Sequence, residues 1–144
     1  MNRVTIEVRK LDFSYGAKPV LRDINLAIEA GEMFAVLGPS GSGKTTLLRL
    51  LAGLERPSSG TIRINRTDVF AIPPAQRNVG VVFQNFSLWP HMSVFENVAF
   101  ALGERQVSSA ELETRVAAML DLLDLAETRD VRPDCLSVGQ QQRG

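Results

Sequence analysis

Polar and apolar residues alternate at the start of the chain. From Val4 to Tyr15 every second residue is largely apolar, a period that predicts a half-buried strand. A turn at residues 16–19 leads to a second predicted strand, Val20 to Ile28. The two strands together predict an antiparallel edge layer.

Two short runs are apolar without alternation, Met33 to Leu37 and Asn78 to Phe83. Such runs are typical of strands buried on both faces of a parallel sheet, so they predict a parallel core sheet. Between them, leucines at helical spacing predict a helix from about Gly43 to Leu54, and Gly60 to Asn65 predicts a further strand.

The pattern becomes helical after residue 84. Ser93 followed by Glu96 forms a capping-box pair, which predicts a helix as far as Leu102. Ser108 or Ser109 predicts the start of a longer helix that ends near Leu125. The chain is therefore predicted to be α/β, with a β-rich part at residues 1–84 and an α-helical subdomain at 85–144.

Composition is that of an ordinary globular chain of 144 residues, 44% hydrophobic and 22% charged. Its 16 basic and 16 acidic residues cancel, so charge gives no reason to expect nucleic acid or an anionic membrane surface as partner. A single cysteine, Cys135, excludes an intrachain disulfide and fits a reducing cytosol. No signal peptide or membrane-spanning run is present, so we expect a cytoplasmic protein that meets a membrane only indirectly.

A Gly/Ser-rich loop lies between a predicted strand and a predicted helix and fits the pattern G-x-x-x-x-G-K-[ST]. It consists of Gly38, Pro39, Ser40, Gly41, Ser42, Gly43, Lys44 and Thr45. Glycines let backbone N–H groups cradle phosphate oxygens, Lys44 neutralises the β- and γ-phosphates, and the Thr45 hydroxyl ligates Mg²⁺. The alternative, a chance linker, requires neither the Lys-Thr pair nor a buried strand before it. The loop therefore predicts binding of a nucleoside triphosphate with Mg²⁺.

Three further segments identify a family resemblance. Leu136 to Arg143 resembles the signature sequence of ABC-transporter ATP-binding subunits, and Val79 to Gln84 resembles their Q-loop strand and glutamine. Tyr15 stands at the place of their A-loop aromatic residue. The resemblance covers essentially the whole chain. It implies an ABC ATPase of the P-loop NTPase fold, with an antiparallel β edge layer, a parallel core sheet and an α-helical subdomain.

The resemblance also implies roles for single residues. Tyr15 stacks on adenine, Gln84 joins the Mg²⁺ shell and positions water, and Thr46 extends the ATP-binding loop. Lys44 and Gln84 are the implied catalytic residues. The alternatives are a Tyr15 that closes its strand onto the core and a Gln84 that faces solvent.

A second half-site is implied by the signature, which in this family closes over ATP held by another subunit in a head-to-tail dimer. Its residues here are Ser137, Val138, Gly139 and Gln140. The alternative is a plain Ser137 cap on a Gln-rich helix. Val138 replaces the usual glycine and would be strained if the backbone there needed a positive φ.

Residues 76–98 look like those of bacterial importers of sulfate, ferric iron, polyamines or sugars. The resemblance implies that Phe86 to Val98 receives the membrane permease subunits, with Phe86 and Trp89 partly exposed; filling the local core is the alternative. His91 is interpreted as a surface or docking residue.

Hydrolysis in this family uses a Walker B strand ending in Asp, a following Glu and a switch His, all beyond the signature. No apolar strand ending in Asp-Glu occurs in these 144 residues, and the chain stops at Gly144 in what looks like a helix opening, which indicates truncation. We hypothesise a transport ATPase whose fragment binds nucleotide weakly at best. A non-catalytic regulatory product and an ABC protein of translation or repair are the alternatives.

Overall fold

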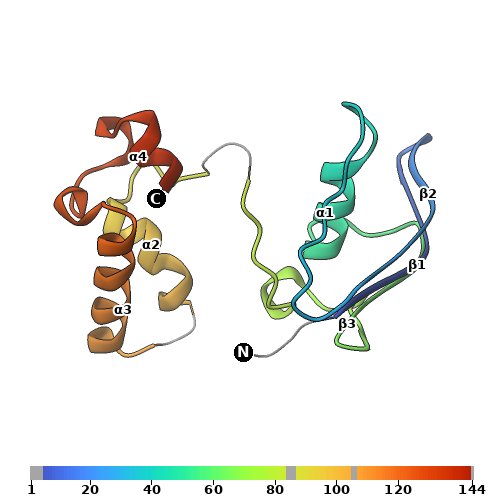
Figure 1. Ribbon diagram of the computed structural model, residues 1–144, viewed down its shortest axis with the longest axis horizontal. Helices are drawn as coiled ribbons and strands as arrows, with labels where there is room; N and C mark the ends of the chain where they lie inside the picture. The colour runs from blue at the N-terminus through green and yellow to red at the C-terminus, as the bar shows by residue number, and fades with distance from the viewer. Residues whose placement is uncertain (1–4, 84–86, 105–106, 144) are drawn as a thin grey trace. The chain divides into compact units, whose positions relative to one another are not determined.

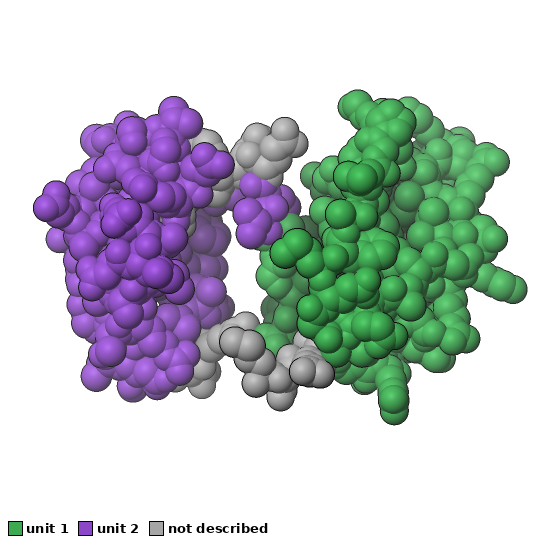
Figure 2. Space-filling view, viewed as in Figure 1, with its two compact units in different colours: residues 1–81 green, residues 82–144 purple. Residues whose placement is uncertain are grey.

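The computed structural model describes residues 5–83, 87–104 and 107–143 (Figure 1). The chain forms two compact units, residues 1–81 and 82–144, which Figure 2 shows in green and purple. We call them unit 1 and unit 2. Among the described residues, no helix combines the length and the apolar character needed to cross a membrane.

Unit 1 is built on one antiparallel sheet. Its strands are β1 (Ile6–Tyr15), β2 (Lys18–Ile28), β3 (Ser59–Ile64) and β4 (Thr67–Asp68), in the spatial order β2-β1-β3-β4. The hairpin of β1 and β2 confirms the predicted antiparallel layer, and β3 pairs with the other edge of β1. A left-handed Gly60 (φ +89°) lets β3 pass close to β1, since a Cβ there would lie 2.3 Å from the carbonyl oxygen of Lys10.

One helix, α1 (Lys44–Ala52), packs on this sheet and completes the core of unit 1. The helix confirms the prediction for residues 43–54, and the left-handed Gly53 (φ +83°) ends it. Leucines at helical spacing bury one side of α1 against strand residues, because their positions recur every three to four residues. The core consists of Val8, Leu11, Phe13, Leu21, Leu47, Leu50, Leu51, Ile62, Ile64 and Val69.

The predicted parallel strands are not formed, and this part of the fold prediction is wrong for the described residues. Met33 to Leu37 and residues 79–83 have no strand pairing, and the side chains of Met33 and Val82 are 97% and 100% exposed. A parallel strand depends on neighbouring strands for its hydrogen bonds and on cover over both faces. All strands of the described residues belong to the one antiparallel sheet. Neither run therefore has a neighbouring parallel strand with which to pair. A short apolar run therefore does not make a strand on its own.

Unit 2 is helical. It contains α2 (Val94–Gly103), α3 (Ser109–Leu122), α4 (Val138–Arg143) and the short 3₁₀ turns η2 (Ala126–Thr128) and η3 (Pro133–Cys135), while the turn η1 (Pro74–Gln76) belongs to unit 1. The two long helices confirm the predictions made from Ser93 and Ser108. They share a core that consists of Val94, Ala99, Val116, Leu120, Leu125 and Leu136.

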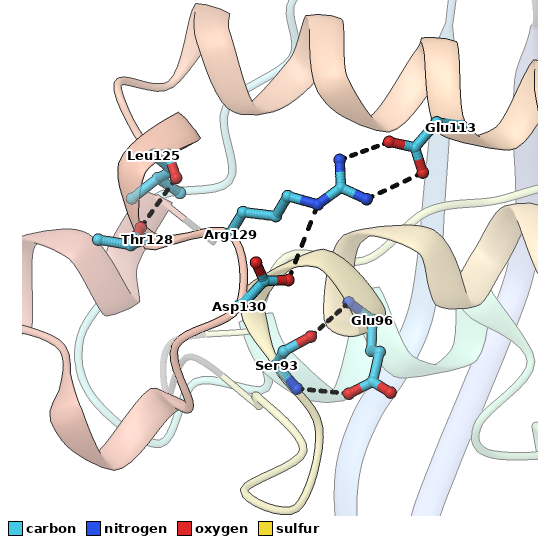
Figure 3. Close-up of polar contacts among 7 residues, drawn as sticks. All are labelled: Ser93, Glu96, Glu113, Leu125, Thr128, Arg129 and Asp130. Atoms are coloured by element: carbon cyan, nitrogen blue, oxygen red, sulfur yellow. Dashed lines mark hydrogen bonds and ion pairs between the residues drawn. The ribbon is translucent and has the colours of Figure 1, made fainter.

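Polar contacts hold the start of α2 and join α3 to the segment that follows it (Figure 3). The predicted capping box is present, since the Ser93 hydroxyl accepts from the N–H of Glu96 (3.2 Å) and the Glu96 carboxylate accepts from the N–H of Ser93 (2.7 Å). These bonds lower the pKa of Glu96. Arg129 donates two hydrogen bonds to Glu113 of α3, one of them 2.9 Å long, and its guanidinium lies 4.0 Å from the ring centre of Phe95 in α2. Arg129 thus ties α2 and α3 to the segment that follows them.

Candidate functional site

The phosphate loop, residues 38–45, leads into α1 through two glycines in the left-handed region. Gly41 has φ +80° and Gly43, the N-cap of α1, has φ +91°. A Cβ on Gly43 would lie 2.7 Å from the side chain of Leu21 and 3.3 Å from that of Val20, both in β2. Glycine at this position therefore allows both the turn into the helix and the close seating of the loop on β2.

The start of α1 is suited to an anion. Gly43 has no side chain to cap the helix, and its first turn contains no acidic residue. The N–H groups at the start of a helix lack intrahelical acceptors and carry the positive end of the helix dipole. They are the donors that a phosphate group accepts from in such loops.

Lys44 lies folded over the loop. Its ammonium donates to the carbonyl oxygens of Gly38 (2.9 Å) and Pro39 (2.7 Å) and to the hydroxyl of Ser42 (3.4 Å). The Lys44 ammonium thus stands within the loop, bonded to neutral groups that a phosphate oxygen can replace. Thr45 is exposed, whereas Thr46 is buried.

A pocket of about 240 Å³ adjoins the loop, between it and β2. Its walls are mostly apolar and include Leu21, Ile24, Leu37 and Leu47, with the ammonium-bearing Lys44 at one side. Apolar walls do not bind phosphate oxygens, so the groups suited to an anion are those of the loop itself and of the first turn of α1.

Tyr15 ends β1 and is 45% exposed. Its ring meets the buried ring of Phe13 edge-on, with 4.7 Å between centroids, and its hydroxyl donates to the Glu55 carboxylate at 3.2 Å. Phe13 in turn pairs in register with Leu21, the residue on which Gly43 is seated. Tyr15 and the phosphate loop thus lie on the same hairpin of β1 and β2, joined through Phe13 and Leu21.

Glu55 was not found by sequence reasoning. It follows α1 by three positions and contacts Tyr15 forty residues earlier in the chain. No local pattern signals this contact, because it depends on how the end of α1 meets the end of β1.

The signature residues lie at the start of α4 in unit 2. The Ser137 hydroxyl accepts from the N–H of Gln140 (3.3 Å), and the Gln140 side chain accepts from the N–H of Ser137 (2.9 Å). Val138 is the first residue of α4 and Gly139 the second, and Val138 is not among the residues with positive φ. The side chain of Val138 is 69% exposed, so the helix accommodates it without strain.

Gln84 and Phe86 lie outside the described residues. Next to them in sequence, Trp89 is 40% exposed and stacks against Phe100 of α2 with 4.2 Å between ring centroids. The side chain of Asn97 holds this turn through bonds to the backbone N–H of Trp89 (2.8 Å) and to its carbonyl oxygen (3.2 Å). His91 is exposed.

Comparison with known proteins places these features in a family. The family described as "ABC transporter" matches residues 21–144. A spermidine/putrescine import ATP-binding protein of Aggregatibacter actinomycetemcomitans is 48% identical over 142 residues, 99% of this chain and 38% of the relative. A sulfate/thiosulfate import ATP-binding protein of Rhodopseudomonas palustris is 49% identical over 97% of this chain and 41% of its own length.

A third relative is an sn-glycerol-3-phosphate import ATP-binding protein of Rhizobium etli, 46% identical over 96% of this chain and 40% of its own length. The chain therefore spans about 38% to 41% of the lengths of these three relatives.

Proposed function

The chain belongs to the ABC transporter family, and we propose that it binds MgATP through residues 38–46 and serves as the ATP-binding part of an importer. The observation that carries the proposal is the phosphate loop, in which a glycine N-cap and the Lys44 ammonium stand at an otherwise uncapped helix start. We also propose that the chain has the P-loop NTPase fold and that it divides into a β-rich ATP-binding part, residues 1–84, and a helical part, residues 85–144.

The loop residues bind the phosphates in the proposed complex. Backbone N–H groups of the loop and of the first turn of α1 donate to the phosphate oxygens. Lys44 gives up its bonds to the carbonyls of Gly38 and Pro39 and donates to the β- and γ-phosphates instead. The exposed Thr45 hydroxyl is the group of the loop that would hold Mg²⁺, which neutralises charge on the phosphates when bound.

Tyr15 is proposed to stack on the adenine ring. Its half-exposed ring is held by Phe13 at the edge and by Glu55 at the hydroxyl, which leaves it ordered but accessible. Aromatic stacking on a base contributes about 1–3 kcal/mol. Gln84 is proposed to join the Mg²⁺ shell and to position the attacking water, as the family resemblance implies.

Assembly is proposed to follow the family. A second copy would contribute Ser137, Val138, Gly139 and Gln140 to the ATP bound by this one, in a head-to-tail dimer at the cytoplasmic face of the membrane. Residues Phe86 to Val98 would meet permease subunits, with the half-exposed Trp89 as one contact. Relatives named for three different solutes match at 46% to 49% identity, so the similarity points to no single solute.

Binding of ATP by the 144-residue chain tests the proposal. The dissociation constant would be measured with and without Mg²⁺ in the parent, in Lys44→Met and in Arg49→Met. Arg49 is an exposed cation on the same helix and serves as the matched control. Loss of a charge-assisted hydrogen bond costs about 1.5–3 kcal/mol, so we expect Mg²⁺-dependent binding that weakens roughly 10- to 100-fold in Lys44→Met alone. Equal loss in the two variants would contradict the assigned role of Lys44.

A further inference from the structure

Arg77 is the one charged side chain among the described residues that is buried, with 7% of its surface exposed. Burial lowers the pKa of its guanidinium, and the charge of Asp68 partly offsets this. An arginine nonetheless keeps its charge in proteins, so burial must be compensated by hydrogen bonds. The partners of Arg77 show what this buried cation does.

The guanidinium of Arg77 joins the end of α1 to the loop before η1. Its Nη1 donates to the carbonyl oxygens of Leu50 (2.9 Å) and Leu51 (3.2 Å), and its Nε donates to that of Ile72 (2.8 Å). The last carbonyls of a helix lack intrahelical donors and carry the negative end of its dipole. Arg77 donates to both the Leu50 carbonyl, which also accepts from the N–H of Gly53 (3.1 Å), and the Leu51 carbonyl. It places a positive charge where the dipole favours it.

Gly53, which ends α1, makes room for this side chain. A Cβ at Gly53 would lie 2.5 Å from the Nε of Arg77. The same guanidinium stands beside a pocket of about 130 Å³ that Gly53, Arg56, Ile72 and Pro74 also line. The helix end, the glycine and the loop are thus fitted around one buried cation.

The other end of α1 is the phosphate loop. The helix has nine residues, so at 1.5 Å per residue its two ends are only about 14 Å apart. An anion at its first turn and a cation at its last turn both stabilise the same hydrogen-bonded helix. Ordering of one end therefore favours ordering of the other.

Resting on the proposed function, we propose that Arg77 is a positioning residue that couples nucleotide occupancy of the phosphate loop to the order of residues 72–77. The guanidinium of Arg77 can bond to the carbonyls of Leu50 and Leu51 only when the last turn of α1 is formed. The backbone of Arg77 continues along the sequence toward Gln84. Coupling is reciprocal. If bound nucleotide raises the equilibrium constant for ordering residues 72–77 by some factor, ordering of those residues raises the nucleotide affinity by the same factor.

Hydrogen exchange tests this coupling at two reporter amides. The N–H of Gln76 donates to the carbonyl oxygen of Pro73 (3.0 Å), and the N–H of Arg77 donates to that of Pro74 (3.1 Å). Hydrogen exchange at these two amides therefore reports the order of residues 72–77. Exchange would be followed by mass spectrometry in the 144-residue chain, with and without MgADP, and nucleotide binding would be measured in the same samples. A coupling in the usual range slows exchange by roughly 5- to 150-fold in the parent.

Three variants separate coupling from mere stability. Arg77→Met removes the guanidinium, and nucleotide should then bind without slowing exchange at residues 76–77. Arg77→Lys keeps the positive charge but not the planar guanidinium, and it provides a test if Arg77→Met does not fold. In Arg77→Lys, MgADP should slow hydrogen exchange by less than half as much as in the parent. Arg56→Met removes a cation beside the same pocket and should behave as the parent.

The outcomes distinguish this inference from the proposed function. If the parent does not bind MgADP, the proposed function fails, and this inference fails with it. If the parent binds MgADP and Arg77→Met or Arg77→Lys retains the full slowing, the inference alone is overturned. Absence of slowing in a parent that binds nucleotide overturns it as well.

Discussion

Replacement of Gly43 by alanine tests how the phosphate loop is seated on β2. Gly43 has φ +91°, and an alanine Cβ would lie 2.7 Å from Leu21 Cδ2 and 3.3 Å from Val20 Cγ1. Leu21 is 6% exposed and belongs to the core of unit 1, so its side chain has little room to retreat. The substitution therefore combines backbone strain with overpacking.

The two contributions separate by comparison with Gly41→Ala. A left-handed conformation costs an alanine about 1–2 kcal/mol, and overpacking of a core costs about 1–3 kcal/mol more. Gly41 has a similar φ of +80°, but nothing lies within 4 Å of its Cβ position. Gly41→Ala should therefore lose only the first amount, and Gly43→Ala both, a total of about 2–5 kcal/mol.

Urea denaturation of the ligand-free proteins measures the difference, since the free energy of unfolding follows from the midpoint and slope of the transition. Ligand-free protein is required because both glycines belong to the proposed nucleotide site. An unfolding free energy for Gly43→Ala that equals that of Gly41→Ala would refute the seating of the loop on Leu21.

Three further substitutions test other parts of the account. Leu50→Ala removes a side chain that is 0% exposed and should lower the free energy of unfolding by about 2–5 kcal/mol in urea titrations, against little change for the exposed Leu48→Ala. Tyr15→Ala should weaken MgATP binding by about 1–3 kcal/mol in fluorescence titrations whereas Tyr15→Phe keeps most of the affinity, and equal loss in both would argue against stacking. The Arg129 hydrogen bonds hold the pKa of Glu113 below its usual 4.5, so this carboxylate stabilises the fold above pH 4.5 and that contribution is lost as pH falls through the lowered pKa. Glu113→Gln should therefore flatten the acid side of the stability profile measured by urea midpoints, and an unchanged profile would contradict the pairing.

Local signals in the sequence predicted the elements that need only their own residues. The alternation before Tyr15, the leucine spacing of α1 and the Ser93–Glu96 capping box each specify a hairpin or helix through neighbouring positions. The predicted strands at Met33 to Leu37 and at residues 78–83 failed for the opposite reason. A parallel strand depends on partners distant in sequence, and the described residues supply none.

The residues of the candidate site likewise fall into those that a local pattern predicts and those that depend on contacts distant in sequence. The phosphate loop was found from its pattern, because its residues are contiguous and their chemistry is carried by glycine, lysine and threonine. Glu55 and Arg77 were missed because their partners are distant in sequence. Glu55 contacts Tyr15, 40 positions away, and Arg77 donates to the backbone carbonyls of Leu50 and Leu51, 27 and 26 positions away. Only the packed unit shows that the segment after α1 contacts Tyr15 through Glu55, while the start of α1 adjoins the loop.

Equilibrium binding of MgATP shows whether the phosphate loop holds nucleotide without depending on turnover. The dissociation constant would be measured by calorimetric titration of the 144-residue chain and of Lys44→Met. We expect saturable binding by the parent that weakens roughly 10- to 100-fold in the variant, because a charge-assisted hydrogen bond is lost. No saturable binding by the folded parent, or an unchanged dissociation constant in Lys44→Met, would contradict it.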